Sequence, residues 1–253
     1  MSNSVERFSS TIANYIRYRP SYPQSLLDTL ISKTQLNGAS SIADIGAGTG
    51  IFSQCLLQNN LSVTAIEPNK YMLAAAKLAL GSDPNFRYLN NSAEQTGLTA
   101  RSIDLICAAQ SFHWFHNQTT RAEFARILKP QGYLALIWNQ REALQPFYRQ
   151  YDAILKKYAT DYETVNHQNI SNEQISRFYA PGSVTSYCFN NQQQFDFTGL
   201  MGRIKSCSYC PSEDSTAFKG LENAVNKLFV QFSDEGLITL EYNCKLYLGR
   251  LHV

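Results

Sequence analysis

The sequence lacks long apolar runs, and its charges of the two signs nearly balance. No stretch of about 18 consecutive apolar residues occurs, so we expect no membrane-spanning helix. Lys and Arg number 22 against 20 Asp and Glu, a formal net charge of +2. This balance gives no general argument for a nucleic acid or a membrane as partner. Residues 1–7 lack the apolar core of a secretion signal, so a cytoplasmic location is expected.

Cysteine is also scarce, with 6 residues spread over a chain of 253. Cys207 and Cys210 form the one close pair. A single pair without a second pair or a nearby histidine makes a poor zinc site, so no metal is expected. A redox role for this pair stays open, although reduced thiols are the ordinary state of cysteines in a cytosolic protein.

The sequence does contain a glycine-rich turn after an apolar stretch. Ile42–Ile45 predicts a strand, and Gly46, Gly48 and Gly50 follow at alternate positions. Such glycines let the chain turn sharply and let a ligand approach the main chain closely. A phosphate-binding loop would need Lys and then Ser or Thr after the last glycine, where Ile51 stands instead, so that interpretation fails. A dinucleotide-binding fingerprint would need a glycine at position 51, so the isoleucine there weakens that interpretation. A purely structural role for the glycine-rich turn stays open.

An acidic residue stands where a nucleoside-binding fold needs one. Leu61–Ile66 predicts a second strand, which ends at Glu67, 21 residues after Gly46. A carboxylate at the end of the next strand, about 20 residues on, is placed to accept hydrogen bonds from the two hydroxyls of a ribose. Asn69 is then expected to cap a helix that Gly81 ends.

Strand and helix patterns alternate strictly from residue 41 to residue 138, which predicts a parallel sheet with helices on both faces. Within this part, Thr120 and Glu123 have the spacing of a capping box, and Lys129–Gly132 is expected to end the helix that they begin. The last apolar-polar stretch alternates cleanly, as an antiparallel strand closing the sheet would. The predicted strands are 41–45, 61–66, 86–89, 103–109, 133–138, 183–190 and 238–248, and the later helices are 143–158, 171–179 and 218–232.

At three places the sequence resembles the class I S-adenosylmethionine-dependent methyltransferases. Asp44 and the glycines at 46, 48 and 50 have the form of that family's first motif. The stretch 13–23, with Arg19-Pro20, and the stretch 110–115, Gln-Ser-Phe-His-Trp-Phe, are similar to the methyltransferase type 11 subgroup that includes trans-aconitate methyltransferase-like proteins. The resemblance covers about residues 8–251.

The resemblance implies the fold class α/β: a Rossmann-like doubly wound sheet of seven strands with the last antiparallel, plus a helical cap of about 195–235 inserted before the last strand. The whole chain, 1–253, is expected to be a single methyltransferase domain. It would comprise an N-terminal lid segment (1–35), a cofactor-binding core (36–140) and a C-terminal half with the cap (141–253).

The cofactor implied by the resemblance is S-adenosylmethionine. Tyr15 and Arg19 of the lid segment are expected to meet its methionine carboxylate, a task that suits a guanidinium group. The segment Asn91–Glu94 departs from the family pattern because it lacks the usual nearby glycine. The expected cofactor-binding residues are Tyr15, Arg19, Asp44, Gly46, Ala47, Gly48, Thr49, Glu67, Pro68, Met72, Ala93, Glu94 and Gln110.

The expected activity is methyl transfer to a small-molecule acceptor, with a carboxylate as one option. His113 is a candidate general base, with a ring-packed histidine that shapes the pocket as the alternative. The expected substrate-binding residues are Trp138, Arg141, Ser206 and Tyr209.

Two other functions stay open. A nucleic-acid methyltransferase would usually show a basic stripe or an Asn/Asp-Pro-Pro-Tyr signature after the fourth strand, and neither occurs. A non-catalytic S-adenosylmethionine-binding protein on the same fold would carry the same turn. The oligomeric state is not readable from the sequence.

Overall fold

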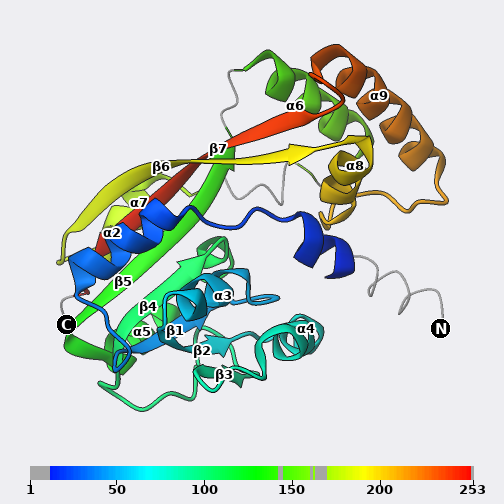
Figure 1. Ribbon diagram of the computed structural model, residues 1–253. Helices are drawn as coiled ribbons and strands as arrows, with labels where there is room; N and C mark the ends of the chain where they lie inside the picture. Colours follow the sequence, from blue (N-terminus) through cyan, green and yellow to red (C-terminus); the bar gives the residue numbers. More distant parts are fainter. Residues whose placement is uncertain (1–11, 142–144, 160–161, 163–169, 252–253) are drawn as a thin grey trace. The chain divides into compact units, whose positions relative to one another are not determined.

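The computed structural model describes residues 12–141, 145–159, 162 and 170–251 (Figure 1). Its strands form one seven-stranded mixed sheet in the order β3-β2-β1-β4-β5-β7-β6. β1 to β5 pair in parallel, and β7 runs antiparallel to β5 (Figure 1). The predicted fold class is therefore confirmed. The strands are β1 (Ser41–Ile45), β2 (Ser62–Ile66), β3 (Phe86–Leu89), β4 (Ile103–Ala109), β5 (Leu128–Arg141), β6 (Val184–Phe195) and β7 (Ile238–Gly249).

The helices fall close to the predicted positions. The two helices between β6 and β7 occupy the range expected for the inserted cap. The helices, with one 3-10 turn, are α2 (Gln24–Thr34), α3 (Ile51–Gln58), α4 (Lys70–Leu80), η1 (Phe112–Trp114), α5 (Gln118–Ile127), α6 (Pro146–Tyr158), α7 (Asn172–Tyr179), α8 (Phe197–Lys205) and α9 (Thr216–Phe232).

The chain divides into two compact units, which we describe separately. Unit 1 comprises residues 1–20, 140–166 and 190–243, and unit 2 comprises residues 21–139, 167–189 and 244–253. The predicted lid segment contributes residues to both units, and its first 11 residues lie outside the described part of the chain. The expectation of one methyltransferase domain stays a prediction.

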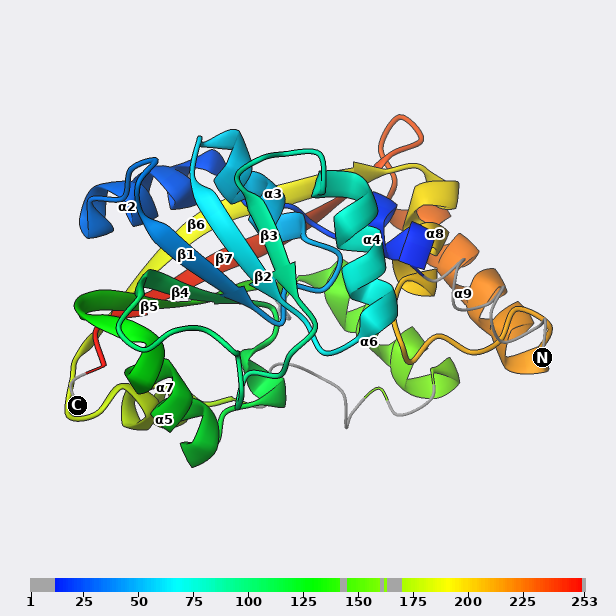
Figure 2. The same ribbon diagram turned by 90° about the horizontal axis from the view of Figure 1, so that it is seen from below.

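Unit 2 buries both faces of its sheet. Along β1, Ile42 packs into a core with α2, α3 and α4, whereas the next residue, Ala43, packs into a second core with α5 and α7. Leu105 and Ile106 of β4 divide in the same way. Figure 2 shows α2 and α3 on one side of these strands and α5 and α7 on the other. Side chains that alternate between two covered faces explain why the sequence of β4 is apolar without a break.

Unit 1 has a core of its own. Apolar side chains of α6, α8 and α9 meet there, among them Leu155, Leu200 and Leu221, each fully buried. Gly220 of α9 lies so close to Tyr158 of α6 that a Cβ atom at position 220 would stand 2.5 Å from the ring. The amphipathic pattern of α9, visible in the sequence, is thus explained by packing within unit 1.

The predicted capping box at Thr120 is wrong. α5 begins at Gln118, and the side chain of Asn117 caps it by accepting a hydrogen bond from Thr120 N at 2.9 Å. Glu123 does not reach back to the helix start but accepts hydrogen bonds from Thr96 N and Oγ1, at 2.9 and 2.5 Å. The Glu123 carboxylate therefore binds the loop at Thr96 and not, as the local spacing predicted, the start of α5.

Two strands are longer than predicted. β5 begins directly after α5, at Leu128, so Lys129–Gly132 lies within the strand, and the register against β4 shifts between Ile103 and Leu105. β6 continues to Phe195 through a polar run of Asn and Gln. β6 is an edge strand, and polar side chains suit its open side.

All six cysteines are free thiols. Among the residues that the structure describes, no helix has the length and apolar character needed to cross a membrane.

Candidate functional site

The glycine turn lies at the carboxyl end of β1, in the middle of the parallel strands of unit 2. Gly46, Gly48 and Gly50 all have positive φ, at 67°, 58° and 84°, a region that L side chains rarely adopt. Gly46 N and Ala47 N both donate to Ile66 O at the end of β2, at 2.8 and 3.2 Å. The turn is therefore fixed against the neighbouring strand, at the sheet edge where α/β folds bind ligands.

Gly46 is required by a close approach to the end of β4. A Cβ atom at position 46 would lie 2.6 Å from Ser111 Cβ. The Ser111 hydroxyl donates to Ile45 O at 2.7 Å. A glycine is therefore needed at position 46 so that the turn can pack closely against Ser111.

Gly48 is different, because the space beside it is open. Apart from Gly48 and its two neighbours in the chain, no described residue has an atom within 4 Å of the place where a Cβ atom at position 48 would stand. The next residue, Thr49, is buried, and its Oγ1 has no hydrogen-bond partner among the described residues. An open glycine beside unmet polar atoms fits a ligand that lies against the main chain.

Asp44 is buried directly beneath the turn. Its Oδ2 accepts from Ser53 Oγ at 2.7 Å, whereas its Oδ1 has no partner among the described residues. Burial, with Glu67 nearby as a second negative charge, raises the pKa of Asp44 to about 7. The protein thus keeps a carboxyl group with a free acceptor oxygen at the strand end.

Glu67 is held at the end of β2 by two main-chain amides. Its Oε2 accepts from Gly48 N at 2.9 Å and its Oε1 accepts from Asn69 N at 2.8 Å. Asn69 caps α4, as the sequence predicted. Each carboxylate oxygen has a second lone pair, so Glu67 can accept two further hydrogen bonds from vicinal hydroxyls.

The other expected cofactor residues of unit 2 surround this edge. Pro68 is exposed beside Glu67, Met72 is half-buried in the first turn of α4, and Ala93 is buried. Glu94 accepts from Asn117 Nδ2 at 3.1 Å. Gln110, at the end of β4, has a left-handed φ of 57°. Their cofactor roles stay predictions.

His113 lies in η1, half-buried next to Trp114, with ring centroids 4.9 Å apart. Burial, and secondarily His116, lowers the pKa of His113 to about 4, so the imidazole is neutral at pH 7. A group with so low a pKa is a weak general base near neutral pH. The catalytic role of His113 stays a prediction. Trp114 is 68% exposed.

The four expected substrate residues do not share one environment. Trp138 is 2% exposed and packs in the second core of unit 2, with its ring centroid 6.2 Å from that of Phe112. Arg141, Ser206 and Tyr209 belong to unit 1. Arg141 donates to Tyr162 Oη at 2.8 Å, and the Tyr162 and Tyr209 rings lie 5.0 Å apart.

Arg19 and Ser206 are brought together, although 187 positions separate them. Arg19 Nε donates to Ser206 Oγ at 3.1 Å, and Nη2 donates to Ser206 O at 3.0 Å. The guanidinium also lies over the ring of Tyr15, 4.6 Å from its centroid. Within unit 1, therefore, one residue expected for the cofactor contacts one expected for the substrate.

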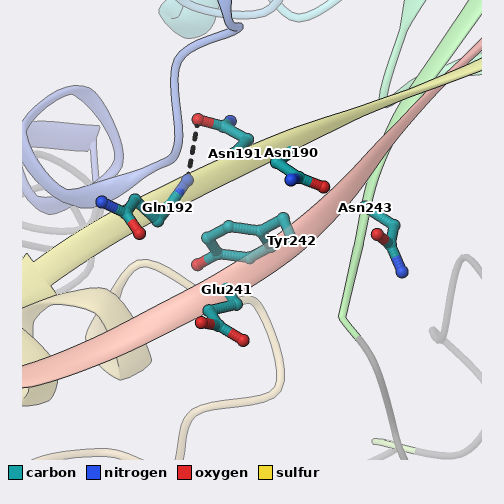
Figure 3. Close-up of a pocket in the computed structure, with 6 residues that line it drawn as sticks. All are labelled: Asn190, Asn191, Gln192, Glu241, Tyr242 and Asn243. Carbon is teal, nitrogen blue, oxygen red and sulfur yellow. Dashed lines mark hydrogen bonds between the residues drawn. The ribbon is translucent and has the colours of Figure 1, made fainter.

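Unit 1 also contains a pocket of about 540 Å³, shown in Figure 3. Every lining residue has a polar side-chain group, and the Asn191 side chain accepts from Gln192 N (Figure 3). Tyr242 Oη donates to Gln193 Oε1 at 3.1 Å. The lining residues are Asn190, Asn191, Gln192, Glu241, Tyr242 and Asn243.

Sequence reasoning missed Ser53, Arg203 and Cys207. Ser53 follows Asp44 by nine positions, a separation that signals no contact until the turn is built. Arg203 lies in α8, four positions before Cys207, which follows the helix, and its Nη1 donates to the Cys207 sulfur at 3.2 Å. The sequence pairs Cys207 with Cys210 by their spacing, but no pattern in it indicates that Arg19 and Arg203 contact Cys207.

The part of the chain that contains this site is similar to known methyltransferases. Residues 43–136 match the family model described as a methyltransferase domain. An uncharacterised methyltransferase-like protein of Schizosaccharomyces pombe is 32% identical over 158 residues, 62% of this chain and 60% of its own. The malonyl-[acyl-carrier protein] O-methyltransferase of Buchnera aphidicola is 31% identical over 157 residues, 61% of each chain.

Solved structures share the fold over almost the whole chain. A structure provisionally assigned as a type II methyltransferase of Anaeromyxobacter dehalogenans superposes with a TM-score of 0.65 at 21% identity, covering 92% of this chain and 98% of its own. The matches to the curated relatives are shorter, and the chain spans about 60% of the length of these two relatives. The matched region, 43–136, contains the glycine turn and Glu67.

Proposed function

We propose that this chain, which carries a methyltransferase domain at residues 43–136, transfers a methyl group from S-adenosylmethionine to a small-molecule acceptor. The observation that carries the proposal is the hydrogen bond from Gly48 N to Glu67 Oε2, at 2.9 Å. This hydrogen bond places Glu67, an acid suited to binding ribose hydroxyls, next to Gly48, beside which the space is open. The site thus has a hydrogen-bond acceptor for hydroxyl groups next to main chain that no side chain covers. The turn lacks the lysine with which a phosphate-binding loop contacts phosphates.

The residues present fit this cofactor. Glu67 would hold the two ribose hydroxyls, and the main chain at Gly48 would lie against the amino-acid end. The free Oδ1 of Asp44 and the free Oγ1 of Thr49, both buried, would gain partners. When bound, the cofactor supplies an activated methyl group on a sulfonium. Pro68 and Met72 lie just after Glu67, where a flat base would stack.

The work left to the protein is orientation. Holding the acceptor in line with the methyl group and excluding water can contribute on the order of 7–11 kcal/mol to the lowering of the barrier. The neutral His113 is not needed when the acceptor atom is already deprotonated, as in a carboxylate. The proposed acceptor is therefore a small carboxylate, which would be esterified. The named activity of the Buchnera relative is also an O-methylation.

Calorimetric titration with S-adenosylmethionine tests the proposal. Gly48→Ala would place a methyl group in the open space and should weaken binding at least about tenfold. Gly236→Ala is the matched control, because Gly236 also has positive φ, at 76°, and also has no atom within 4 Å of its Cβ position. The two variants share the backbone strain and differ in location.

Glu67→Gln should also weaken S-adenosylmethionine at least about tenfold, because it removes the charge that the ribose hydroxyls would contact. NAD, titrated in parallel, should not bind. The proposal is wrong if the wild type binds NAD instead, or if Gly48→Ala and Gly236→Ala bind S-adenosylmethionine equally well.

A further inference from the structure

Two arginine side chains of unit 1 converge on Ser206 and Cys207, just after α8, and neither has a carboxylate partner among the described residues. Arg19 contacts Ser206 through Nε and Nη2, and its Nη2 lies 3.5 Å from Cys207 Sγ. Arg203 Nη1 donates to Cys207 Sγ at 3.2 Å and to Ser206 Oγ at 3.4 Å. Arg203 Nε is buried and has no hydrogen-bond partner in the described part of the chain.

Arg141 of the same unit, in contrast, is paired with an acid. Its Nη2 lies 3.3 Å from Asp152 Oδ1, and Tyr162 Oη, which accepts from Arg141, donates to the same aspartate at 2.7 Å. That guanidinium is paired and its partners are satisfied. Arg19 and Arg203 instead bring two positive charges together without an acid, an arrangement that is costly unless an anion joins them.

Cys207 supplies the anion within the protein. Its side chain is 3% exposed. Burial alone would raise the pKa of this thiol, but Arg19 and Arg203 outweigh burial and lower the pKa to about 6. The phenols of Tyr209 and Tyr151 also face this cluster. The two guanidinium groups therefore favour the thiolate form of the sulfur that lies between them.

The sulfur has a partner in either protonation state. As a thiolate it accepts from Arg19 and Arg203, and as a thiol it can donate to Arg203 O at 3.6 Å. It can therefore take up a proton without being left unpaired. The two guanidinium groups would then be available to another anion.

A ligand has room beside this cluster. The Arg19 and Arg203 residues are each half-buried, with Arg203 Nε itself buried. Tyr242, which lines the pocket of about 540 Å³, is close enough to Arg203 to interact with its charge. The pocket can hold the body of a small molecule while a guanidinium holds its acidic end.

We propose that Arg19 and Arg203 form a binding site for the carboxylate of the methyl acceptor, in which the Cys207 sulfur is an internal anion that the carboxylate replaces. The assignment to the acceptor rests on the proposed methyl transfer. Binding leaves the ligand covalently unchanged: the Cys207 thiolate takes one proton from solvent and becomes a thiol as the carboxylate pairs with the arginines. Carboxylate binding is thus coupled to proton uptake.

Titration calorimetry at about pH 7.5, between the pKa of Cys207 in the protein and that of an ordinary thiol, tests this site. The probes are succinate, citrate and the uncharged dimethyl succinate, with and without saturating S-adenosylhomocysteine. At least one carboxylate should bind and the diester should not. Arg203→Met should weaken binding at least about tenfold, and Arg203→Lys should weaken it less. Arg149→Met, at an exposed arginine of α6, is the matched control and should bind like the wild type.

Proton uptake separates ligand binding from a structural role. Repeating the titration in Tris and in HEPES should show uptake of up to about one proton in the wild type and none in Cys207→Ser, which should still bind the carboxylate. Near-ultraviolet circular dichroism of each variant establishes that it is folded. The proposal fails if no carboxylate binds folded wild type, if Arg203→Met and Arg149→Met bind alike, or if uptake persists in Cys207→Ser.

The methionine carboxylate of the cofactor is the other source of the same chemistry. If Arg19→Met and Arg203→Met lose S-adenosylmethionine while binding of the probes is unchanged, the site belongs to the cofactor and the acceptor assignment is overturned. If the wild type binds a carboxylate but not S-adenosylmethionine, the proposed methyl transfer fails while the anion site stands.

Discussion

The buried carboxyl group of Asp44 is the residue whose ionisation most affects the candidate site. Its pKa of about 7 lies well above the ordinary 3.8, chiefly because of burial. The folded protein therefore holds a proton that the unfolded chain releases between about pH 4 and pH 7. Since the folded state binds more protons in this window, the contribution of Asp44 to stability decreases as the pH rises and is constant above pH 7.

Asp44→Asn should remove this dependence. The variant keeps an oxygen that can accept from Ser53 Oγ but carries no charge. At pH 8 it should be more stable than the wild type by roughly 2–4 kcal/mol, and the difference should shrink toward zero by about pH 4. Urea denaturation across this range measures it. A difference that does not change with pH would show that Asp44 is ionised at neutral pH in the folded protein.

The site residues that could be predicted from the sequence are those whose partners lie close in the chain or on adjacent parallel strands. Asp44 and Glu67 were found because the turn and the next strand have recognisable patterns. The approach of Arg19 to Cys207, beside Arg203, could not be found, because it joins residues far apart in sequence through the packing of unit 1. No local pattern records such a meeting.

Among the elements, α5 depends on one acid for its attachment to the preceding loop. Glu123 accepts from Thr96 and, through both oxygens, from Arg126, with the Arg126 Nε to Oε2 distance at 2.7 Å. The hydrogen bonds from Arg126, against the opposing effect of burial, lower the pKa of Glu123 to about 2. The stabilisation is therefore present above about pH 4.5 and is lost as the pH falls toward 2.

Glu123→Gln should cost about 1–2 kcal/mol at pH 7, because it breaks the charged contacts and leaves a buried hydroxyl with a weaker acceptor. The cost should diminish below pH 4.5, because there the Glu123 carboxyl group of the unfolded wild-type chain takes up a proton and the folded one does not until about pH 2. Glu173→Gln is the control, since Glu173 pairs with Arg177 at 2.6 Å but its side chain is 72% exposed. That variant should lose at most about 0.5 kcal/mol. Equal losses in urea denaturation would contradict the assignment.

The elements also show where local patterns decide structure. The helix cap at Asn69 was predicted correctly because its partner amides lie two and three residues on. The cap at Thr120 was predicted wrongly because the Glu123 carboxylate accepts hydrogen bonds from Thr96, in a loop 27 positions away. β6 exceeded its predicted length because pairing, not apolar alternation, defines an edge strand with polar side chains.

For the whole molecule, the division of the core limits what a mutation should do. Leu221 is fully buried in the core of unit 1, and Asp44, Gly48 and Glu67 belong to unit 2. Leu221→Ala should lower the free energy of unfolding by about 2–5 kcal/mol. Where the protein remains folded, its affinity for S-adenosylmethionine should stay within about twofold of the wild type.

Leu78→Ala provides the comparison, because Leu78 of α4 is 91% exposed. It should change stability by no more than about 0.5 kcal/mol. Urea denaturation and calorimetry on both variants give the two quantities. A folded Leu221→Ala protein that has lost S-adenosylmethionine binding would contradict the placement of the site in unit 2.

The sheet order and its helices were predictable because alternating strands and helices leave few possible topologies. The separation of the chain into two units was not, since residues 1–20, 140–166 and 190–243 carry no shared pattern that marks them as neighbours. The Asn- and Gln-rich part of β6 looked like a strand end, whereas Asn190, Asn191 and Gln192 line a pocket.

The chain has two tryptophans, and they lie in opposite environments: Trp138 is 2% exposed in a core, and Trp114 is 68% exposed beside His113. The protein therefore carries a natural optical reporter. Emission from the buried indole should be blue-shifted and shielded from collisional quenchers such as acrylamide, whereas emission from Trp114 should be red-shifted and quenched readily. A ligand that binds next to η1 would be seen in the second signal alone, without any attached label.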